Sequence, residues 1–557
     1  MKVKENILRI KPFRGIVRFK DIVTVLLRYG FDGLVEKLGL PGGHLVKRFT
    51  KIKEGMTIWE RIRHAIEELG PTYIKFGQIL SMRPDLVPAG LLEELKELRE
   101  DVYHEDFNLI KEMIEKSFSR KLEDLFASIE RVPVAAGSLA QVHKAVLKKT
   151  GETVAVKVQR PGIEMIIKSD LEILQSVTRI MHERIEAIQL YNIPGIVDEV
   201  RKHIVRELDF TNEANNIQIF KQNFLGESDV HAPDVYVDYS NDMVLTMEFI
   251  EGEKIGDLVE IDGRKERIAR RGLEIVQKQI FIDGFFHADP HSGNIRVLEG
   301  DVICFLDWGM VGRLTAEMKA ALLDFFVAVI RKDSKKLIRT TLSMAVNVPP
   351  LLDETGLEAE IIFVLDKVHS TILKSVDVGR FLMDLLGLFR EYRIELRTDY
   401  VYMVKAVMAI EGTGKELCED FDIISELRPL TTRLLLKRYN PFVSDKVLLG
   451  KLLETLRVTL NFPVRMERFL NVVEGGKLSI DIHHKGIESM HWSIRLVGNR
   501  VAIALVIASL VIGSSVVITS GVGPFLFGYP ILGIAGYIFS AFIGFWLVVH
   551  MILKRSI

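Results

Sequence analysis

Two short runs between residues 287 and 309 combine residue types that suit phosphate chemistry. His287, Asp289 and Asn294 follow the pattern H-x-D-x-x-x-x-N, and Asp307 begins the sequence Asp-Trp-Gly thirteen residues after Asn294. A carboxylate can accept a proton from a hydroxyl group, while an Asn and a second Asp can hold a Mg²⁺ ion that bridges nucleotide phosphates. Either run alone is a weak signal. Both in this order, joined by an apolar run at 302–306, predict a nucleotide and metal site. The alternative is a pair of surface turns rich in Asp, Asn and Gly.

A lysine upstream adds to this prediction. Residues 154–157 (VAVK) match the V-A-I-K strand of protein kinases, whose lysine reaches the α and β phosphates. A lysine in so apolar a strand needs an acidic partner, because burying an unpaired charge is unfavourable. Asp209 and Glu213 stand four residues apart on one face of a predicted helix, and both are candidates. Glu207 and Asp209 would point to nearly opposite faces of a straight helix, so one of them faces away or the helix bends.

The segment before this strand departs from ordinary kinases. The chain has neither a G-x-G-x-x-G sequence ahead of Lys157 nor a Walker A motif. Small residues stand there instead, and they still allow backbone N–H groups to approach phosphates. We expect nucleotide contacts from this stretch, namely from Val134, Ala135, Ala136, Gly137, Ser138, Leu139, Ala140, Gln141 and Val142.

Five spaced motifs together resemble the UbiB family of atypical kinases. They are the alanine-rich loop, HADPHSGN at 287–294, the E-x-D of Glu207 and Asp209, the Asp-Trp-Gly element, and KFGQ at 75–78. The last of these matches the family's K-x-G-Q motif and is followed by SMRPD at 81–85. The resemblance covers about residues 55 to 310, and two apolar segments at the C-terminal end fit it as well.

The resemblance implies an α+β, protein-kinase-like bilobal fold with an N-terminal helical extension and a C-terminal transmembrane helical hairpin. It also implies ATP (or ADP) and Mg²⁺ as cofactors and a role in ubiquinone (coenzyme Q) biosynthesis. It gives each matching residue an expected role: Lys75 and Gln78 over the active site with Lys75 near Glu207 and Asp209, Lys157 paired with Glu213, Asp289 as catalytic base, His287 in support, Asn294 and Asp307 on the metal, and Glu248 and Phe249 in a hinge contacting adenine.

Three departures from the expected patterns bear on activity. Gly137 replaces an alanine of the family's loop, which leaves the preference between ATP and ADP open. His291 stands where ordinary kinases carry a lysine two residues after the catalytic Asp. A helix start at 315–318 follows Asp307 almost at once, without an A-P-E element. Since that segment docks peptide substrates in protein kinases, we expect peptide phosphorylation to be disfavoured.

Composition separates one end of the chain from the rest. The 557 residues carry a formal net charge of −1, with 48% apolar and 27% charged residues, which argues against a nucleic-acid binder and against a disordered chain. Residues 501–553 contain no Asp, Glu, Lys or Arg. They predict two transmembrane helices, at about 501–520 and 531–553, joined by a turn rich in Gly and Pro. A buried helical hairpin, or one span with a re-entrant segment, are the alternatives.

Basic residues at both outer ends of this region favour a hairpin with both ends in the cytoplasm. No early apolar stretch is long enough for a secretory signal, so we expect a multi-pass protein of a cell membrane, such as a bacterial inner membrane, with a cytoplasmic kinase-like domain. Cys304 and Cys418 have no metal-binding spacing, and Cys304 reads as a small core residue.

The remaining organisation follows from local patterns. A basic amphipathic arm is expected at 1–55, where an anionic membrane surface and packing on its own domain are alternative partners. We divide the rest as follows: a helical extension at 56–130, an N-lobe at 131–250, a helical C-lobe at 251–480, a linker at 481–500 and the membrane segment at 501–557.

These observations favour a membrane-anchored, kinase-like ATPase or small-molecule kinase. Its expected partners are membrane lipids, isoprenoid quinone precursors and lipid-biosynthetic enzymes, and no nucleic acid. A nucleotide-sensing scaffold for lipid-biosynthetic enzymes is the first alternative, and a conventional protein kinase is the second.

Overall fold

The computed structural model describes residues 11–38, 55–98, 104–185, 193–370, 378–419, 421 and 487–553. It forms two compact units, residues 1–443 and residues 444–557, and each is described by itself. Much of the predicted N-terminal arm, the part of the predicted C-lobe after 421 and the first residues of the predicted linker lie outside the described residues. The domain boundaries drawn from the sequence stay predictions.

A five-stranded antiparallel sheet carries the motif lysine. Its order is β1-β3-β4-β6, with β2 added on β3. The strands are β1 (Phe126–Ile129), β2 (Ala135–Ala136), β3 (Ala140–Leu147), β4 (Thr153–Gln159) and β6 (Val244–Glu248). The turn at 148–152 joins β3 to β4, and Gly151 takes a φ of 75° there, which glycine tolerates well. Lys157 pairs with Val142 on one side and Leu245 on the other, in the middle of the sheet.

The two faces of this sheet are packed differently. Alternate residues of β4 (Val154, Val156 and Val158) are fully buried against apolar side chains of α7 (Phe107–Phe118) and α8 (Leu122–Leu125). Lys157 therefore projects from the opposite face. There, α12 (Phe210–Asn223) packs Phe210 against β3 and β6.

Helices from the N-terminal part of the chain form a separate layer. They are α2 (Lys11–Arg28), α3 (Asp32–Lys37), α4 (Ile58–Leu69), α5 (Pro71–Ser81), α6 (Ala89–Lys96), α9 (Ile163–Arg184) and α11 (Ile193–Leu208). The apolar face of α2 buries Ile22 and Val25 against Leu69 and Tyr73, and Arg18 Nε lies 2.6 Å from the fully buried Asp170. Of our two readings of this basic segment, packing on its own domain holds for residues 11–38.

The remainder of unit 1 is mostly helical with small sheets. Its helices are α13 (Arg264–Gln277), a π-helical turn η4 (Lys278–Asp283), α14 (Ala316–Ile330), α15 (Ser334–Met344), α16 (Glu354–Ser370), α17 (Val378–Glu391) and α18 (Thr398–Leu417). Its strands are β5 (Val230–His231), β7 (Glu253–Lys254), β8 (Phe285–His287), β9 (Ile295–Leu298), β10 (Val302–Phe305), β11 (Val311–Arg313), β12 (Ala345–Asn347) and β13 (Glu395–Leu396). Short 3₁₀ turns complete it: η2 (Val237–Tyr239), η3 (Ile255–Asp257), η5 (Ser292–Asn294) and η6 (Glu299–Asp301).

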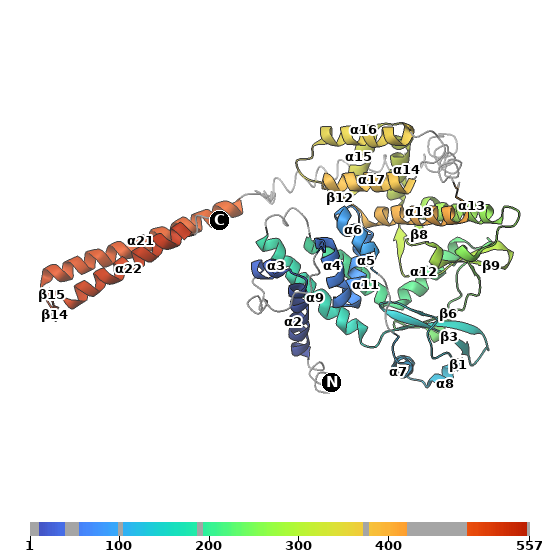
Figure 1. The fold of residues 1–557 in the computed structure, drawn as a ribbon, viewed down its shortest axis with the longest axis horizontal. Helices are drawn as coiled ribbons and strands as arrows, with labels where there is room; N and C mark the ends of the chain where they lie inside the picture. The colour runs from blue at the N-terminus through green and yellow to red at the C-terminus, as the bar shows by residue number, and fades with distance from the viewer. Residues whose placement is uncertain are drawn as a thin grey trace, which may run out of the picture. The chain divides into compact units, whose positions relative to one another are not determined.

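One apolar core joins these elements. It runs from α5 and α11 through α13, β8 and β10 to α17 and α18. In Figure 1, α14 to α17 lie on one side of α13 and α18, and the strands β3 and β6 lie on the other. Cys304 is completely buried in β10, as predicted for a core residue.

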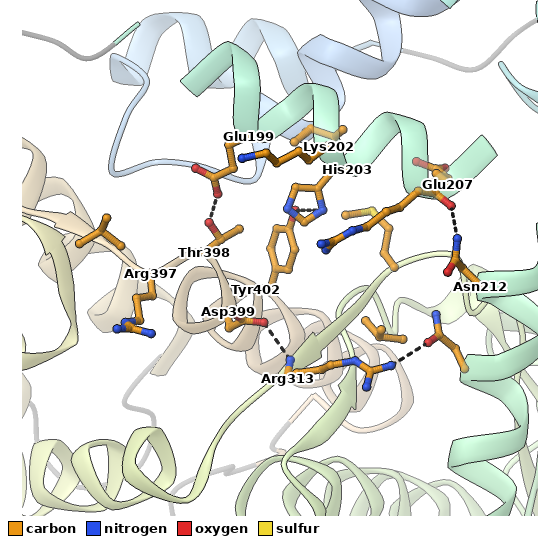
Figure 2. A pocket seen from close by; sticks show the side chains of 17 residues that line it. Glu199, Lys202, His203, Glu207, Asn212, Arg313, Arg397, Thr398, Asp399 and Tyr402 are labelled. Carbon is orange, nitrogen blue, oxygen red and sulfur yellow. Dashed lines mark hydrogen bonds between the residues drawn. The ribbon is translucent and has the colours of Figure 1, made fainter. Parts of the chain in front are cut away.

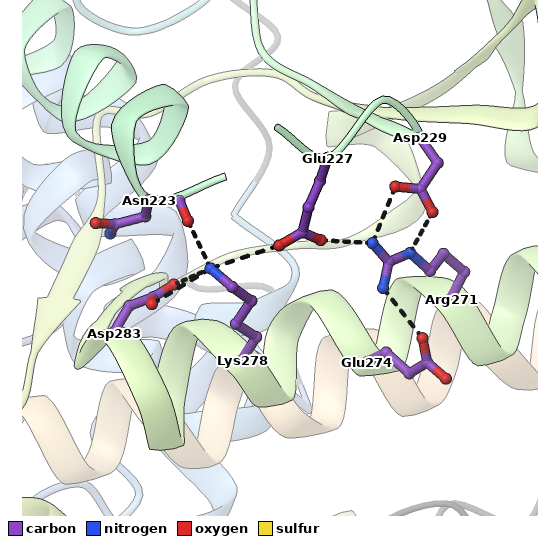
Figure 3. A network of polar contacts seen from close by, with 7 residues as sticks. All are labelled: Asn223, Glu227, Asp229, Arg271, Glu274, Lys278 and Asp283. Atoms are coloured by element: carbon purple, nitrogen blue, oxygen red, sulfur yellow. Dashed lines mark hydrogen bonds and ion pairs between the residues drawn. The ribbon is translucent and has the colours of Figure 1, made fainter. Parts of the chain in front are cut away.

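A polar network fixes α13 to the chain that leads into β5 (Figure 3). Arg271 places Nε 2.6 Å from Asp229 and Nη2 2.7 Å from Glu227, while Lys278 lies 3.1 Å from Asp283. β5 follows directly and pairs in parallel with β10. The network therefore anchors β5, the strand beside β10, and β10 leads into the Asp-Trp-Gly element.

The described residues of unit 2, 487–553, form two helices that pack on each other, α21 (Ile487–Ser520) and α22 (Ile531–Leu553). A small turn formed by β14 (Phe525–Leu526) and β15 (Tyr529–Pro530) lies between them in the sequence. Small residues let them approach closely: a Cβ on Gly536 would collide with Ser514, and Ser540 is buried. Val501–Ser520 is long and apolar enough to cross a membrane, and Ile531–Phe545 is a shorter apolar helix. Length and composition therefore support the first of the two predicted spans, while the second span and the hairpin stay predictions.

Candidate functional site

A cavity of about 450 Å³ lies beneath the five-stranded sheet. Its walls come from the β2–β3 turn, β4, α12, the end of β6, and the loops around Asn294 and Asp307. Segments separated by more than 150 residues therefore meet at one site. The sequence motifs predicted this convergence.

Lys157 is the charged centre of the cavity. Its Nζ lies 2.8 Å from Glu213 Oε2 and 3.5 Å from Asp307 Oδ1. Burial tends to lower the pKa of Lys157, but Asp307 and Glu213 outweigh it and raise this pKa above its usual value. The ammonium group therefore stays protonated. Glu213, and not Asp209, is its partner, which is the pairing implied by the family resemblance.

Asp307 has the charge and conformation expected of a metal ligand. The Lys157 ammonium group is the main cause that holds the pKa of Asp307 below its usual range, and Lys75 adds to the effect. Its side chain remains 57% exposed. Asp307 adopts a φ of 51°, which is uncommon for a residue with a Cβ. The next residue, Trp308, is fully buried against Phe220 and Phe285, so the packing of the tryptophan holds the turn in place.

The loop that follows β8 is fixed by its own polar contacts. His287 Nε2 donates to the Leu306 carbonyl (2.9 Å), and His287 Nδ1 accepts from the backbone N–H of Asp289 (3.0 Å). Both contacts suit a neutral imidazole, and burial is the main cause that lowers the pKa of His287. Asn294 Nδ2 donates to the Asp289 carbonyl at 3.2 Å. The buried His287 side chain thus connects this loop to Leu306, which precedes Asp307.

Helix α5 contributes a second lysine. Lys75 forms an ion pair with Glu207 at the end of α11, and both residues line the cavity. Gln78 and Asp209, both described, do not line it. Asp209 breaks the helix, because α11 ends at Leu208 and the Asp209 side chain caps α12 by accepting from Thr211 N at 3.0 Å. Of the two alternatives left open for Glu207 and Asp209, the helix break is the one found, and Asp209 caps the helix that follows it.

The loop of small residues before Lys157 forms one wall of the cavity. Residues 134–140 and Val142 line the cavity, and Gly137 N donates to the Ala140 carbonyl at 2.8 Å to close the turn. Gln141 is different, because it is buried with its amide 2.8 Å from His143 and does not line the cavity. Glu248 and Phe249 do line it, although the Glu248 carboxylate is already bound to His231 at 2.7 Å.

The residues present suit Mg²⁺ held through a nucleotide. Among the described residues no group of three His, Cys, Asp or Glu could hold a metal ion alone. Mg²⁺ is typically bound by one or two carboxylates together with substrate phosphates and water. The ionised, exposed Asp307 and the amide of Asn294 on the same cavity wall meet that requirement.

A second cavity of about 710 Å³ is lined by residues of α11 and α18 and shares Glu207 with the first. Figure 2 shows His203 of α11 pointing toward Tyr402 of α18, and Asp399 of α18 beside Arg313. Sequence reasoning missed the contribution of α18. It also missed Arg160, which is 3% exposed and donates from Nε to the Gly137 carbonyl at 2.9 Å. Nothing local in the sequence marks either contact.

Comparisons with known proteins find relatives along most of the chain. Residues 97–341 match the ABC1 atypical kinase-like domain, residues 362–422 the UbiB helical domain, and residues 485–553 the ABC1/UbiB kinase-like C-terminal domain. The chain is 31% identical over 443 residues to the probable protein kinase UbiB of Aeromonas hydrophila, covering 77% of this chain and 80% of that protein.

Two further matches are with a relative from Clostridium pasteurianum and with a solved structure. The chain is 30% identical over 542 residues to an uncharacterized protein in the hydrogenase 1 5′ region of Clostridium pasteurianum, covering 97% of this chain and 99% of that protein. A solved structure, the complex of Rv3197 with erythromycin from Mycobacterium tuberculosis, is 20% identical with a TM-score of 0.43, covering 62% of this chain and 87% of that chain.

Proposed function

The chain belongs to the ABC1/UbiB atypical kinase-like family, and from that premise we propose that it is a membrane-anchored ATPase or small-molecule kinase. It binds ATP with Mg²⁺ in the cavity beneath the sheet of a bilobal, protein-kinase-like fold. Turnover supports the synthesis of ubiquinone or of another isoprenoid lipid. Isoprenoid quinone precursors in the membrane, and the enzymes that process them, are the proposed partners.

The observation that carries this proposal is the arrangement of Lys157, Glu213 and Asp307 around one cavity. Lys157 Nζ lies 2.8 Å from Glu213 and 3.5 Å from Asp307, so its charge is held where phosphates would enter. Bound Mg²⁺ would neutralise phosphate charge. Asp307 and Asn294 would hold the ion, Lys157 would orient the phosphates, and Asp289 would accept the proton of the attacking hydroxyl or water.

The surroundings support a small acceptor over a peptide. β11 follows the Asp-Trp-Gly element at once, and Thr315 already caps α14 with its hydroxyl accepting from Met318 N. The described residues between Asp307 and α14 therefore leave no segment long enough for a peptide to lie on. The polar second cavity shares Glu207 with the first and offers about 710 Å³ beside the site. A small substrate fits such a space.

The membrane part of the proposal goes beyond the single span that length and composition support. We propose that α22 also crosses the bilayer, and that the pair forms a hairpin with both outer ends in the cytoplasm. Large apolar side chains such as Leu505, Phe539 and Phe542 are more than half exposed on these helices, which suits a lipid environment. The kinase-like domain then works next to lipid substrates.

The test uses the full chain in lipid vesicles with Asp307→Asn and Asp289→Asn. We expect Asp307→Asn to weaken Mg²⁺-dependent nucleotide binding, and both variants to lose ATP turnover by at least about 100-fold. Asp384→Asn is the control, because Asp384 forms an ion pair with Lys367 outside the cavity (2.9 Å) and should leave turnover unchanged. Wild-type turnover in either site variant would refute the proposal.

Two alternatives have distinct outcomes. If Asp289→Asn binds nucleotide, lacks turnover and still restores lipid synthesis in a deletion strain, the protein acts as a nucleotide-sensing scaffold. Robust phosphate transfer to peptides would identify it as a protein kinase and contradict the argument from the short segment after Asp307.

A further inference from the structure

Asp289, at the predicted catalytic-base position, is held by a lysine that no motif identifies. Lys405 Nζ lies 2.8 Å from Asp289 Oδ2, and the two side chains are 30% and 28% exposed. Lys405 comes from α18, more than 100 residues further along the chain. We propose that Lys405 is a positioning residue for the reaction: its ammonium group holds the Asp289 carboxylate in a fixed orientation. This inference rests on the proposed function.

The loop itself supplies no such charge. His291 occupies the place where ordinary kinases carry a lysine, and its imidazole has a different task. His291 Nδ1 accepts a hydrogen bond from Gly293 N at 3.0 Å and so caps the short turn η5. The loop position is therefore used to shape the backbone around Asn294, and the cation near Asp289 reaches it from another element.

The backbone of Asp289 is fixed while its side chain depends on Lys405. His287 and Asn294 bind the N–H and the carbonyl of Asp289, at 3.0 Å and 3.2 Å. The carboxylate makes its ion pair with Lys405. Loss of Lys405 would therefore leave the loop in place and free the carboxylate to change rotamer.

The helix that carries Lys405 is rigidly held. Tyr400, Val401 and Met403 of α18 are each at most 3% exposed, in the core that also contains α13 and β8. Lys405 Nζ also lies 3.1 Å from Met82 Sδ, at the end of α5. An ammonium group on so well packed a helix has a defined position, which is what orienting a carboxylate requires.

Two helices outside the kinase-like match thus act on carboxylates inside it. Residues 97–341 make up that match, yet Lys75 of α5 pairs with Glu207 and Lys405 of α18 pairs with Asp289. The second contact ties the helical domain, residues 362–422, to the reaction itself. On this account the site is incomplete without that domain.

The test compares Lys405→Met, which removes the charge but keeps a side chain of similar length, with Lys405→Arg, which keeps the charge. Steady-state ATP hydrolysis is measured on the full chain in lipid vesicles. We expect Lys405→Met to lower kcat about tenfold or more. KM for ATP should change less than about twofold, because Lys405 does not line the nucleotide cavity. Lys405→Arg should recover most of kcat.

A matched control separates this effect from the loss of any half-buried ion pair. Lys336 lies 3.3 Å from Asp324, and the two side chains are 31% and 26% exposed, on α15 and α14. Lys336→Met should leave kcat unchanged. Melting temperatures of both Met variants show whether they fold equally well.

The decisive measurement is a double-mutant cycle with Asp289→Asn. If Lys405 acts through the carboxylate, adding Lys405→Met to Asp289→Asn causes no further loss in the residual rate. An additive loss would mean a purely structural role and overturn the inference, as would wild-type kcat in Lys405→Met. An active Asp289→Asn enzyme would instead refute the proposed function, so the two failures are distinguishable.

Discussion

Three charged side chains decide whether the cavity can hold a nucleotide, and each depends on the others. Lys157 lies between Glu213, which is 4% exposed, and Asp307, which faces the cavity. The buried carboxylate holds the lysine in place, and the lysine keeps Asp307 ionised. A buried ion pair adds little stability by itself, but removing one partner leaves a charge without compensation.

We therefore predict that Lys157→Met weakens ATP binding at least tenfold and lowers the melting temperature, because Glu213 loses its counter-charge. Lys148→Met is the control: Lys148 lies at the other end of the same hairpin, on the surface, where it donates to the Glu123 carbonyl at 2.7 Å and lies 3.8 Å from Asp124. Binding is measured with a fluorescent ATP analogue. Unchanged affinity in Lys157→Met would show that this cavity is not the nucleotide site.

His203 gives the fold a predictable response to acid. Burial, followed by the charges of Arg206 and Arg83, lowers the pKa of His203 to about 4. In the unfolded chain this pKa is about 6.5, so between pH 6.5 and pH 4 the unfolded state binds one proton more than the folded state. The free energy of unfolding must then fall as the pH is lowered through this range, by at most about 1.4 kcal/mol per pH unit for this group.

His203→Gln removes the titrating group and can still bond to Tyr402, whose hydroxyl lies 3.4 Å from His203 Nδ1. We expect denaturant unfolding of this variant to be less sensitive to pH between 6.5 and 4 than that of the wild type. Equal slopes would contradict the assignment of a neutral His203.

At the scale of elements, the sequence predicts those parts that follow from local patterns. The β3–β4 hairpin, the Lys157 strand and the burial of Cys304 all follow from short-range periodicity and turn residues. The sequence left the helix break at Asp209 as one of two possibilities, because an Asp in this stretch can either continue the helix or cap the next one. Contacts such as Arg160 with Gly137, or Lys405 with Asp289, join distant segments and are fixed by packing, so no local pattern marks them.

Arg83 shows what such packing does for the elements around the site. Its guanidinium group, 3% exposed, binds Asp85 through two hydrogen bonds of 2.9 and 2.8 Å, and reaches Glu199 of α11 at 3.0 Å and Thr398 of α18 at 3.2 Å. One side chain thus joins the end of α5 to the helices that bear Glu207 and Lys405. Arg83 and Asp85, in the SMRPD run after the K-x-G-Q motif, therefore hold these helices together.

Arg83→Met should destabilise the fold by about 3–5 kcal/mol, because it leaves the fully buried Asp85 carboxylate unpaired. Arg63→Met should cost less than about 1 kcal/mol, because Arg63 pairs with Glu67 and Glu94 at a partly exposed surface. The double variant Arg83→Met with Asp85→Leu should recover part of the loss. Denaturant unfolding measures all three, and equal stability of the two single variants would refute this account.

At the scale of the molecule, the chain combines parts made for different surroundings. Its overall charge of −1 conceals a C-terminal region, residues 501–553, without any Asp, Glu, Lys or Arg. The basic α2 does not offer its apolar face to a membrane, because Ile22 and Val25 are buried against α4 and α5. Among the described residues, the large exposed apolar surface of α21 and α22 is then the feature best suited to hold the protein in a bilayer.

Deletion of residues 501–557 should consequently release the protein from membranes. In cell fractionation, we expect the truncated chain in the soluble fraction and the full chain in the membrane fraction, even at 1 M salt, where charge attraction to lipid head groups is screened within about 3 Å. The basic residues of α2 supply the control: reversing Arg14 and Lys20 to Glu should leave membrane retention of the full chain unchanged. If the truncated chain stays on membranes at high salt, an apolar surface elsewhere in the protein is the anchor, and α21 and α22 are not needed to hold the protein in the bilayer.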